Sequence, residues 1–291
     1  MAETLATHHM LSVATWAGYA TTTLVLGGLV YERFVAPRSG RLPLGAAVAL
    51  GLGAAAAALP LRAAEISGDG LTAIAEPEVF HHVVASTFGG AVVLRAGGLL
   101  VLAASLGGRR RPGILPAAAR AGGGAILVAS YLVIGHPQAS DPVTVEVAAL
   151  TVHLVATATW FGGVAVLASE LAPAGRFRRP LPAAAVGRFS RMAEVMVVLV
   201  LVSGLVLAEG QGALTTAPWR TGYGLALTVK LGFVAVVLAI GGYNRQRVVP
   251  AVARHDDAAA RRHLRTTCVV EALVISMGVL VMTAAMTSGG F

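Results

Sequence analysis

Eight long apolar stretches separated by short polar segments dominate this sequence of 291 residues. They run at roughly 10–31, 43–61, 80–106, 113–135, 145–170, 189–208, 222–243 and 266–287. Each is close to the ~20 residues with which an α-helix crosses ~30 Å of hydrocarbon. The runs are continuous in Ala, Val, Leu and Gly, whereas a membrane β-barrel needs alternating strands. The sequence therefore predicts an all-α, polytopic membrane bundle with eight transmembrane helices.

The composition excludes several other classes of protein. Hydrophobic residues make up 56% of the chain and charged residues 12%, which leaves too little polar surface for a soluble domain of this size. The chain opens without a basic leader or a cleavage site, so we expect the first stretch to remain as a helix. Cys268 is the single cysteine, which excludes a disulfide within the chain. Because no P-loop, dinucleotide fingerprint or activated nucleophile is present, we expect no enzymatic activity.

The charge distribution predicts the orientation in the membrane. A net charge of +8 could suggest a nucleic acid partner, but most arginines fall in alternate loops or at the helix ends beside them. Only Arg62 and Arg220 lie in the loops between. Because cytoplasmic loops carry the positive excess, we expect an N-out/C-out protein of a bacterial cytoplasmic (inner) membrane, with no nucleic acid bound. The arginines on the predicted inner side are Arg33, Arg38, Arg41, Arg109, Arg110, Arg111, Arg176, Arg178, Arg179, Arg188, Arg191, Arg245, Arg247, Arg254, Arg261, Arg262 and Arg265.

One short pattern occurs twice, about half the chain length apart. His9 and Trp16 are separated by six residues, and so are His153 and Trp160. An even number of helices in each half keeps the orientation, so we expect two tandem four-helix repeats, residues 1–136 and 137–291, related by an axis along the membrane normal. Arg95 and Lys230 would then occupy corresponding places in the two halves.

Imidazole and thioether groups gather near the predicted outer ends of the helices. This mixture of ligands suits copper, Cu(I) or Cu(II), whereas calcium and magnesium prefer oxygen ligands. The alternative is that each His is a hydrogen-bonded structural group and each Met simply packs. The candidate metal ligands are His153, His136, His9, His81, His82, Met282 and Met286.

Several other residues suggest a polar route through the bundle. Lys230, Arg95 and Glu271 fall inside apolar stretches, where an ionisable side chain is costly unless it is paired or faces water. We consider both structural pairing and a pathway, with Trp160 and Trp16 on the same faces as the duplicated histidines. Met192, Met196 and Cys268 could form a soft site near the inner end, although such residues are also ordinary apolar filling.

Several short motifs along the chain carry a family resemblance. They are Gly135-His136, His153 with Trp160 to Gly163, Arg188 to Arg191, Ser203-Gly204, Lys230, Asn244-Arg245, Arg265 and Glu271. These motifs resemble the CopD family of copper-resistance membrane proteins, which includes the membrane portion of YcnJ-type copper importers. The resemblance is strongest over about 130–291. It implies an eight-helix inner-membrane protein that moves copper inward, often with a periplasmic CopC-type copper-binding partner, here a separate protein.

The sequence therefore favours copper uptake, with His136 and His153 at the core of the site and His9 as an accessory. One alternative is a membrane electron-transfer protein that binds haem b, because histidines on facing helices can serve as axial ligands. Another is a non-catalytic subunit of a membrane assembly, embedded in the lipid bilayer, whose polar groups only fix the register of its helices. A homo-oligomer is compatible with each.

Overall fold

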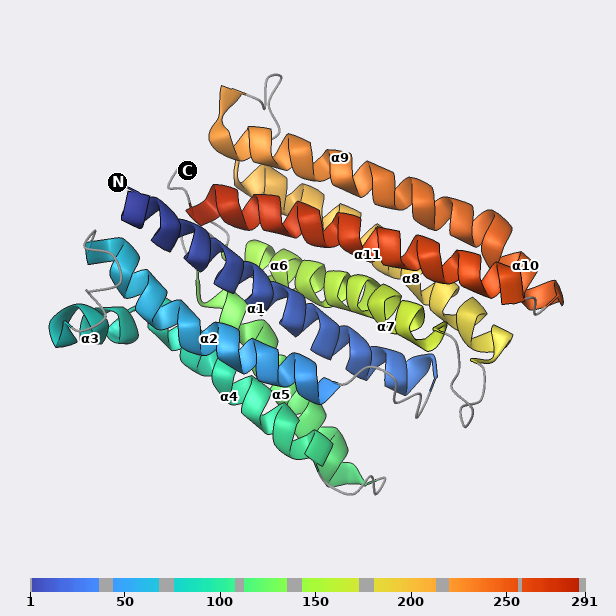
Figure 1. The fold of residues 1–291 in the computed structure, drawn as a ribbon, viewed down its shortest axis with the longest axis horizontal. Coiled ribbons are helices and arrows are strands. Elements are labelled where there is room, and N and C mark those ends of the chain that lie inside the picture. The colour runs from blue at the N-terminus through green and yellow to red at the C-terminus, as the bar shows by residue number, and fades with distance from the viewer. Residues whose placement is uncertain are drawn as a thin grey trace.

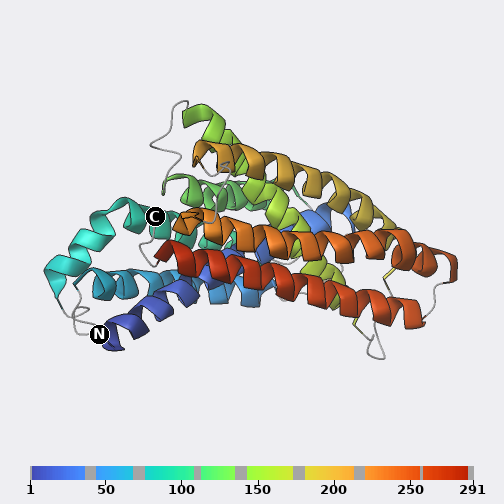
Figure 2. The ribbon, with the colours of Figure 1, turned by 90° about the horizontal axis from the view of Figure 1, so that it is seen from above.

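The computed structural model describes residues 2–36, 44–67, 76–107, 113–134, 143–172, 181–212, 220–255 and 258–287. These ranges contain helices and no strand. Eight of the helical segments are long and apolar enough to cross a membrane, which confirms the predicted count and the all-α class. The long helices lie side by side along the longest axis of the molecule (Figures 1 and 2).

The first half of the described chain forms five helices. Their bounds are α1 Ala2–Phe34, α2 Leu44–Ser67, α3 Pro77–Ala85, α4 Thr87–Gly107 and α5 Ile114–Leu132.

In the second half, two short π-helical segments interrupt otherwise α-helical elements. The elements are α6 Val143–Thr157, η3 Ala158–Gly162, α7 Gly163–Glu170, α8 Ala183–Gly210, α9 Gly222–Tyr243, η5 Asn244–Val248, α10 Val249–His255 and α11 Ala258–Thr287.

The apolar stretch at 80–106 is not a single helix. The chain leaves helical geometry at Ser86, where ψ is 167°. The Ser86 Oγ accepts a hydrogen bond from the Gly89 N–H at 3.3 Å, so Ser86 caps the start of α4. The membrane span therefore begins at Thr87, and the preceding residues form the separate helix α3 beside α2 and α4. His81 and His82 belong to α3, not to the start of the span as we expected.

Helix α1 joins the two halves of the molecule. It packs against α2 in the first half and against η3, α7 and α11 in the second (Figure 1). The backbones approach closely at Gly27 and Gly162: a Cβ added at Gly162 would lie 2.9 Å from the Gly27 Cα and would overlap the Thr23 carbonyl oxygen. Two glycines therefore allow two helix backbones to touch, as is common between helices in membranes.

The two halves pack differently. In the first half α2 contacts α4, whereas α8 and α9 barely touch among the described residues. The largest apolar cluster instead joins α7, α8, α10 and α11. No described feature tests the boundary between the predicted repeats, which stay a prediction.

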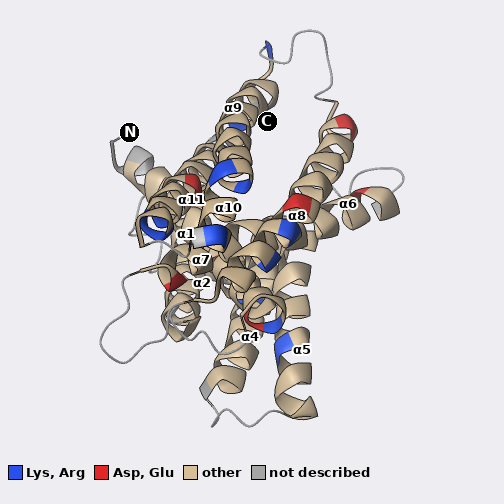
Figure 3. Cartoon of the chain, turned by 90° about the vertical axis from the view of Figure 1, so that its right-hand side faces the viewer, with Lys and Arg blue, Asp and Glu red and all other residues tan. Residues whose placement is uncertain are grey.

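The start of α1 and the end of α11 lie at one end of the bundle, which we call the terminal end; the opposite end is the α10 end (Figure 1). Viewed from the α10 end, several ribbon segments of α1, α8 and α10 are coloured blue for Lys and Arg (Figure 3). This arrangement agrees with the loop pattern from which we predicted the orientation.

Candidate functional site

His153 lies in α6, at the contact between α6 and α8. Its Nδ1 is 3.2 Å from the Val200 carbonyl oxygen and 3.2 Å from the Ser203 Oγ. A carbonyl oxygen only accepts hydrogen bonds, so Nδ1 carries the hydrogen, and the neutral ring keeps its lone pair on Nε2. The imidazole is thus held in one orientation with one nitrogen available to a ligand.

Gly204 gives this ring its space. A Cβ at Gly204 would lie 3.3 Å from the His153 Cε1 and 3.5 Å from its Nδ1. Any larger side chain would push the imidazole away from α8. The adjacent Ser203 and Gly204 therefore have separate roles: one bonds to the ring and the other makes room for it.

Lys230, in α9, is close enough to act electrostatically on His153. The lysine side chain is half-buried, and its ammonium group forms no hydrogen bond or ion pair with another described residue. An ionisable group without a partner inside a membrane is costly, and such groups mark functional positions or water-filled paths. The two residues bring two titratable nitrogens into one region of the second half.

Trp160 lies in η3, the π-helical segment between α6 and α7. Its side chain and that of Asn244 are within hydrogen-bonding reach of the Glu271 carboxylate. Thr267 Oγ1 donates to Asn244 Oδ1 at 2.7 Å, which leaves the Asn244 NH₂ for Glu271. Glu271 is 3% exposed. The buried carboxyl group of Glu271 therefore has two uncharged hydrogen-bond donors beside it, one from η3 and one from η5.

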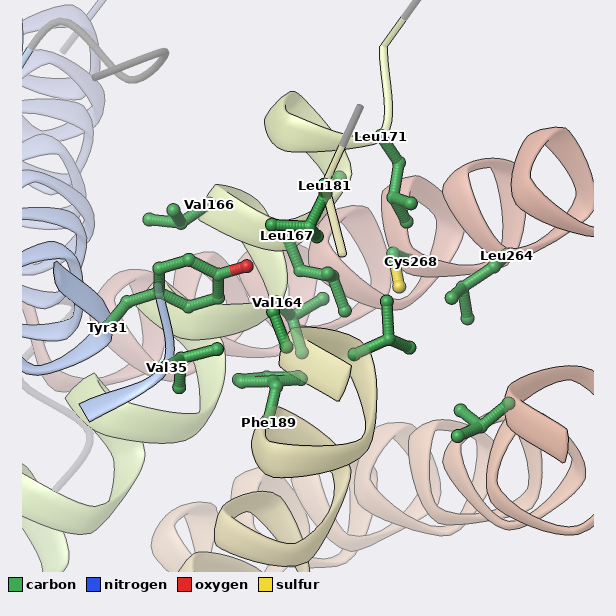
Figure 4. Close-up of a cluster of buried hydrophobic side chains, with 14 of the residues drawn as sticks. Tyr31, Val35, Val164, Val166, Leu167, Leu171, Leu181, Phe189, Leu264 and Cys268 are labelled. Atoms are coloured by element: carbon green, nitrogen blue, oxygen red, sulfur yellow. The ribbon is translucent and has the colours of Figure 1, made fainter. Parts of the chain in front are cut away.

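The three sulfur residues of the predicted inner site belong to one packed cluster. Cys268 is buried among apolar side chains such as Leu264 and Phe189 (Figure 4). Met192 and Met196 are partly buried against the same cluster. Packing alone accounts for the two methionines, whereas Cys268 also lines a cavity with Glu271.

Arg95 is buried in α4 without a carboxylate partner among the described residues. Its guanidinium carbon lies 4.1 Å from the centre of the Tyr131 ring, which is a cation–π contact. The Tyr131 hydroxyl donates to the Gly18 carbonyl at 3.1 Å and lies 3.0 Å from the Thr22 Oγ1. The Arg95 Nε has no hydrogen-bond partner. Aromatic packing between α1, α4 and α5 thus holds this cation in place of an ion pair.

The first copy of the His/Trp pattern is placed differently from the second. His9 is exposed, while the neighbouring His8 places its Nδ1 3.2 Å from the Glu65 Oε1. Arg62 also pairs with Glu65. Trp16 donates from Nε1 to the Ser276 carbonyl of α11 at 3.1 Å. In the first copy, therefore, the tryptophan links α1 to α11 by a hydrogen bond, and the histidine is exposed on the surface of the bundle.

The remaining predicted ligands are dispersed. His81 and His82 are exposed on α3, where they line a shallow hollow together with Glu78. Met282 is buried in α11. His136 and the side chain of Met286 lie outside the described residues. Among the residues that the structure describes, no three His, Cys, Asp or Glu side chains form a group that could hold a metal ion.

Glu146 is a buried acid that our sequence reasoning did not select. It is 6% exposed, faces Gly210 of α8, and its Oε2 has no hydrogen-bond partner. A signal was present in the sequence, because Glu146, His153 and Trp160 are each seven residues apart and so lie on one face of a helix. Asn244 was noted only as part of a family motif, and its contact with Glu271 depends on the packing of η5 against α11.

This architecture defines a multi-pass α-helical membrane protein with polar groups buried in its second half. Residues 4–144 match the family described as copper resistance protein D-like, N-terminal domain, and residues 183–286 match copper resistance protein D. The chain is 30% identical over 258 residues to the inner membrane protein YebZ of Escherichia coli (strain K12), covering 87% of this chain and 86% of that one. It belongs to the CopD family of copper resistance proteins and is a multi-pass inner membrane protein. No solved structure matches it.

Proposed function

We propose that this protein carries copper ions across the membrane, from the terminal end toward the α10 end, without enzymatic chemistry. The observation that supports this best is His153, whose ring is fixed by Val200 and Ser203 with Nε2 left available. Neutral imidazole is a good ligand for copper, and a hydrogen bond at the other ring nitrogen is how proteins orient such ligands.

The positive charge near His153 suits a site from which a transported ion must be released. Lys230 acts electrostatically on the same imidazole, and a protonated amine would weaken the binding of a copper ion there. Transport needs binding that is favourable enough to admit the ion and weak enough to release it. The site at His153 is therefore a transient one in this proposal.

The two ends of the bundle differ in charge, and this difference supports the proposed direction. Acidic residues such as Glu65, Glu76 and Glu78 lie toward the terminal end and raise the local concentration of cations. Arginines gather at the α10 end (Figure 3). A separate CopC-type copper-binding protein would deliver the ion to the terminal end.

The test is copper accumulation by cells that express His153→Ala. We expect accumulation to fall to the level of cells without the protein, because no other described side chain presents an imidazole nitrogen at this depth of the α6–α8 contact. His263→Ala is the matched control, since His263 is exposed in α11 and contacts the Tyr243 ring. Membrane levels of each variant are measured by immunoblot. Accumulation equal to wild type in His153→Ala would rule out the role given to this residue.

A further inference from the structure

A cavity of about 400 Å³ lies in the half of the bundle nearer the α10 end, between α7, α8, α9, η5 and α11. One wall is the apolar cluster of Phe189, Val164 and Leu167 (Figure 4). The lining also includes the polar residues Asn244 and Glu271, together with Trp160 and Cys268 of the same cluster. The cavity is separate from the His153 contact with α8, which does not line it.

One residue of this lining is a buried carboxylate. Glu271 is 3% exposed and its neighbours Trp160 and Asn244 are both uncharged. No described Lys or Arg forms an ion pair with it. A buried carboxylate is costly unless a positive charge compensates it. The geometry therefore requires either a proton or a bound cation at Glu271.

A thiol lies next to this carboxylate. Cys268 precedes Glu271 by three residues in α11, so both side chains are on one face of the helix. Both line the cavity, and Cys268 is 3% exposed. A sulfur ligand selects soft metal ions, and Cu(I) in particular, over sodium or magnesium.

An ion pair forms an exposed part of the cavity lining. Arg245 of η5 donates through Nε to one carboxylate oxygen of Glu194 in α8, and its other nitrogen lies 3.4 Å from the second oxygen. Both residues line the cavity, and both side chains are about half exposed, 43% and 52%. The pair is therefore exposed, whereas Cys268 and Glu271 of the same lining are buried.

We propose that this cavity is a second Cu(I) site, in which Cys268 and Glu271 bind the ion and the Arg245–Glu194 pair controls its release at the α10 end. This inference rests on the proposed copper transport and adds the place where the ion stays after His153. Trp160 and Asn244 position the carboxylate. The Cys268 proton leaves to solvent as the sulfur binds the metal.

The first test uses Cys268 itself, because it is the only cysteine in the chain. Purified protein in detergent is treated with N-ethylmaleimide, without oxygen, in the presence or absence of Cu(I). Cu(I) at about ten times its dissociation constant leaves about a tenth of the thiol free, so labelling slows about tenfold. We expect Glu271→Gln to lose this protection. Glu209→Gln, an exposed acid of α8 outside the cavity, should keep it.

A second measurement covers the case in which Glu271→Gln does not fold. Cys268→Ser is nearly isosteric, and its Cu(I) stoichiometry is measured by competition with a coloured chelator. We expect one ion fewer than in wild type. His153→Ala should keep the protection of Cys268. An unchanged stoichiometry in Cys268→Ser, or protection that persists in folded Glu271→Gln, overturns the second site.

The ion pair is tested by the labelling rate without copper. Glu194→Gln breaks the pair, so we expect Cys268 to be labelled several-fold faster, whereas Arg247→Ala, an exposed arginine of η5 outside the pair, should match wild type. Equal rates in Glu194→Gln and wild type overturn the role of the pair.

The two proposals can fail separately. If cells accumulate copper but Cu(I) never protects Cys268, this inference alone fails. If Cu(I) protects Cys268 but no copper is accumulated, the proposed transport fails instead.

Discussion

At the scale of single residues, the same sequence pattern has two different outcomes. His9 and His153 each precede a tryptophan by seven positions, yet His9 is exposed while His153 is held by α8. The difference comes from the neighbours. α8 offers His153 the Val200 carbonyl, the Ser203 hydroxyl and the space above Gly204. The sequence motif therefore identifies the histidine, but the residues of the facing helix determine whether its ring is held in one orientation.

The role of Gly204 leads to a prediction. Gly204→Val places new atoms against the His153 ring, whose Cε1 is only 3.3 Å from a Cβ at this position. Disturbing the groups that orient a metal ligand lowers metal affinity about 10- to 100-fold. We expect Gly204→Val to weaken copper accumulation at low copper concentration and to be partly rescued at high concentration.

Gly187→Val is the matched change in the same helix. The nearest atom to a Cβ at Gly187 is the Arg191 Nη1 at 3.9 Å, so a Cβ there makes only an ordinary van der Waals contact with a flexible side chain. Accumulation by this variant should follow the wild-type curve. A Gly204→Val curve that coincides with it would show that the His153 ring does not depend on Gly204.

At the scale of elements, the π-helical segment η3 decides how the halves meet. It interrupts the run from α6 to α7 and presents Trp160 and Gly162 from a single turn. Gly162 touches the α1 backbone while Trp160 reaches Glu271 of α11. Such π-helical turns are frequently found at functional sites. Here the segment is both a contact between the halves and a wall of the inner cavity.

Gly162→Leu should therefore destabilise the protein. The added side chain meets the Thr23 carbonyl and the Gly27 Cα, and backbone atoms cannot move aside as a flexible side chain can. Overpacking of this kind costs about 1–3 kcal/mol, and occasionally more. We expect a lower midpoint of thermal unfolding in detergent, followed by tryptophan fluorescence. Gly232→Leu in α9 is the control, because nothing lies within 4 Å of its Cβ position; equal midpoints for the two variants would contradict the contact.

At the scale of the whole molecule, charge separates the two ends. Acidic side chains of α2 and α3 lie toward the terminal end, and the arginines of α8, η5, α10 and α11 toward the other (Figures 1 and 3). Arginine-rich segments are retained in the cytoplasm during insertion. Both termini should therefore face outward.

This orientation can be tested with single cysteines in a Cys268→Ser background. Glu76→Cys alters an exposed residue at the terminal end, and Arg262→Cys alters an exposed residue near the α10 end. A membrane-impermeant thiol reagent added to intact spheroplasts should label only the Glu76→Cys protein. After the membranes are broken, both should react. Labelling of Arg262→Cys in intact spheroplasts would reverse the orientation and, with it, the proposed direction of copper movement.

The sequence predicted the element count well and the site only in part. Eight spans follow from run length alone, because a helix that satisfies its own backbone hydrogen bonds needs only enough apolar residues to cross the bilayer. The break at Ser86 was missed, since a single polar residue in an apolar run does not show that its side chain will cap a new helix. His153, Lys230 and Glu271 stood out as polar groups inside apolar runs. Their partners Val200, Asn244 and Thr267 did not, because ordinary residues acquire a role only from the helix opposite.

Three properties of this protein can be read from its amino-acid sequence: it has eight membrane spans, its arginines are concentrated in the segments at the α10 end, and a few costly polar groups lie within the spans. Those properties are local, since each depends on the composition of one segment in contact with lipid or water. Other properties depend on the tertiary structure: His153 is oriented while His9 is not, an aromatic ring holds Arg95, and Glu271 shares a cavity with Cys268. These are contacts between segments far apart in the chain, and the close approach of particular helices, at Gly162 and Gly204 among others, sets them.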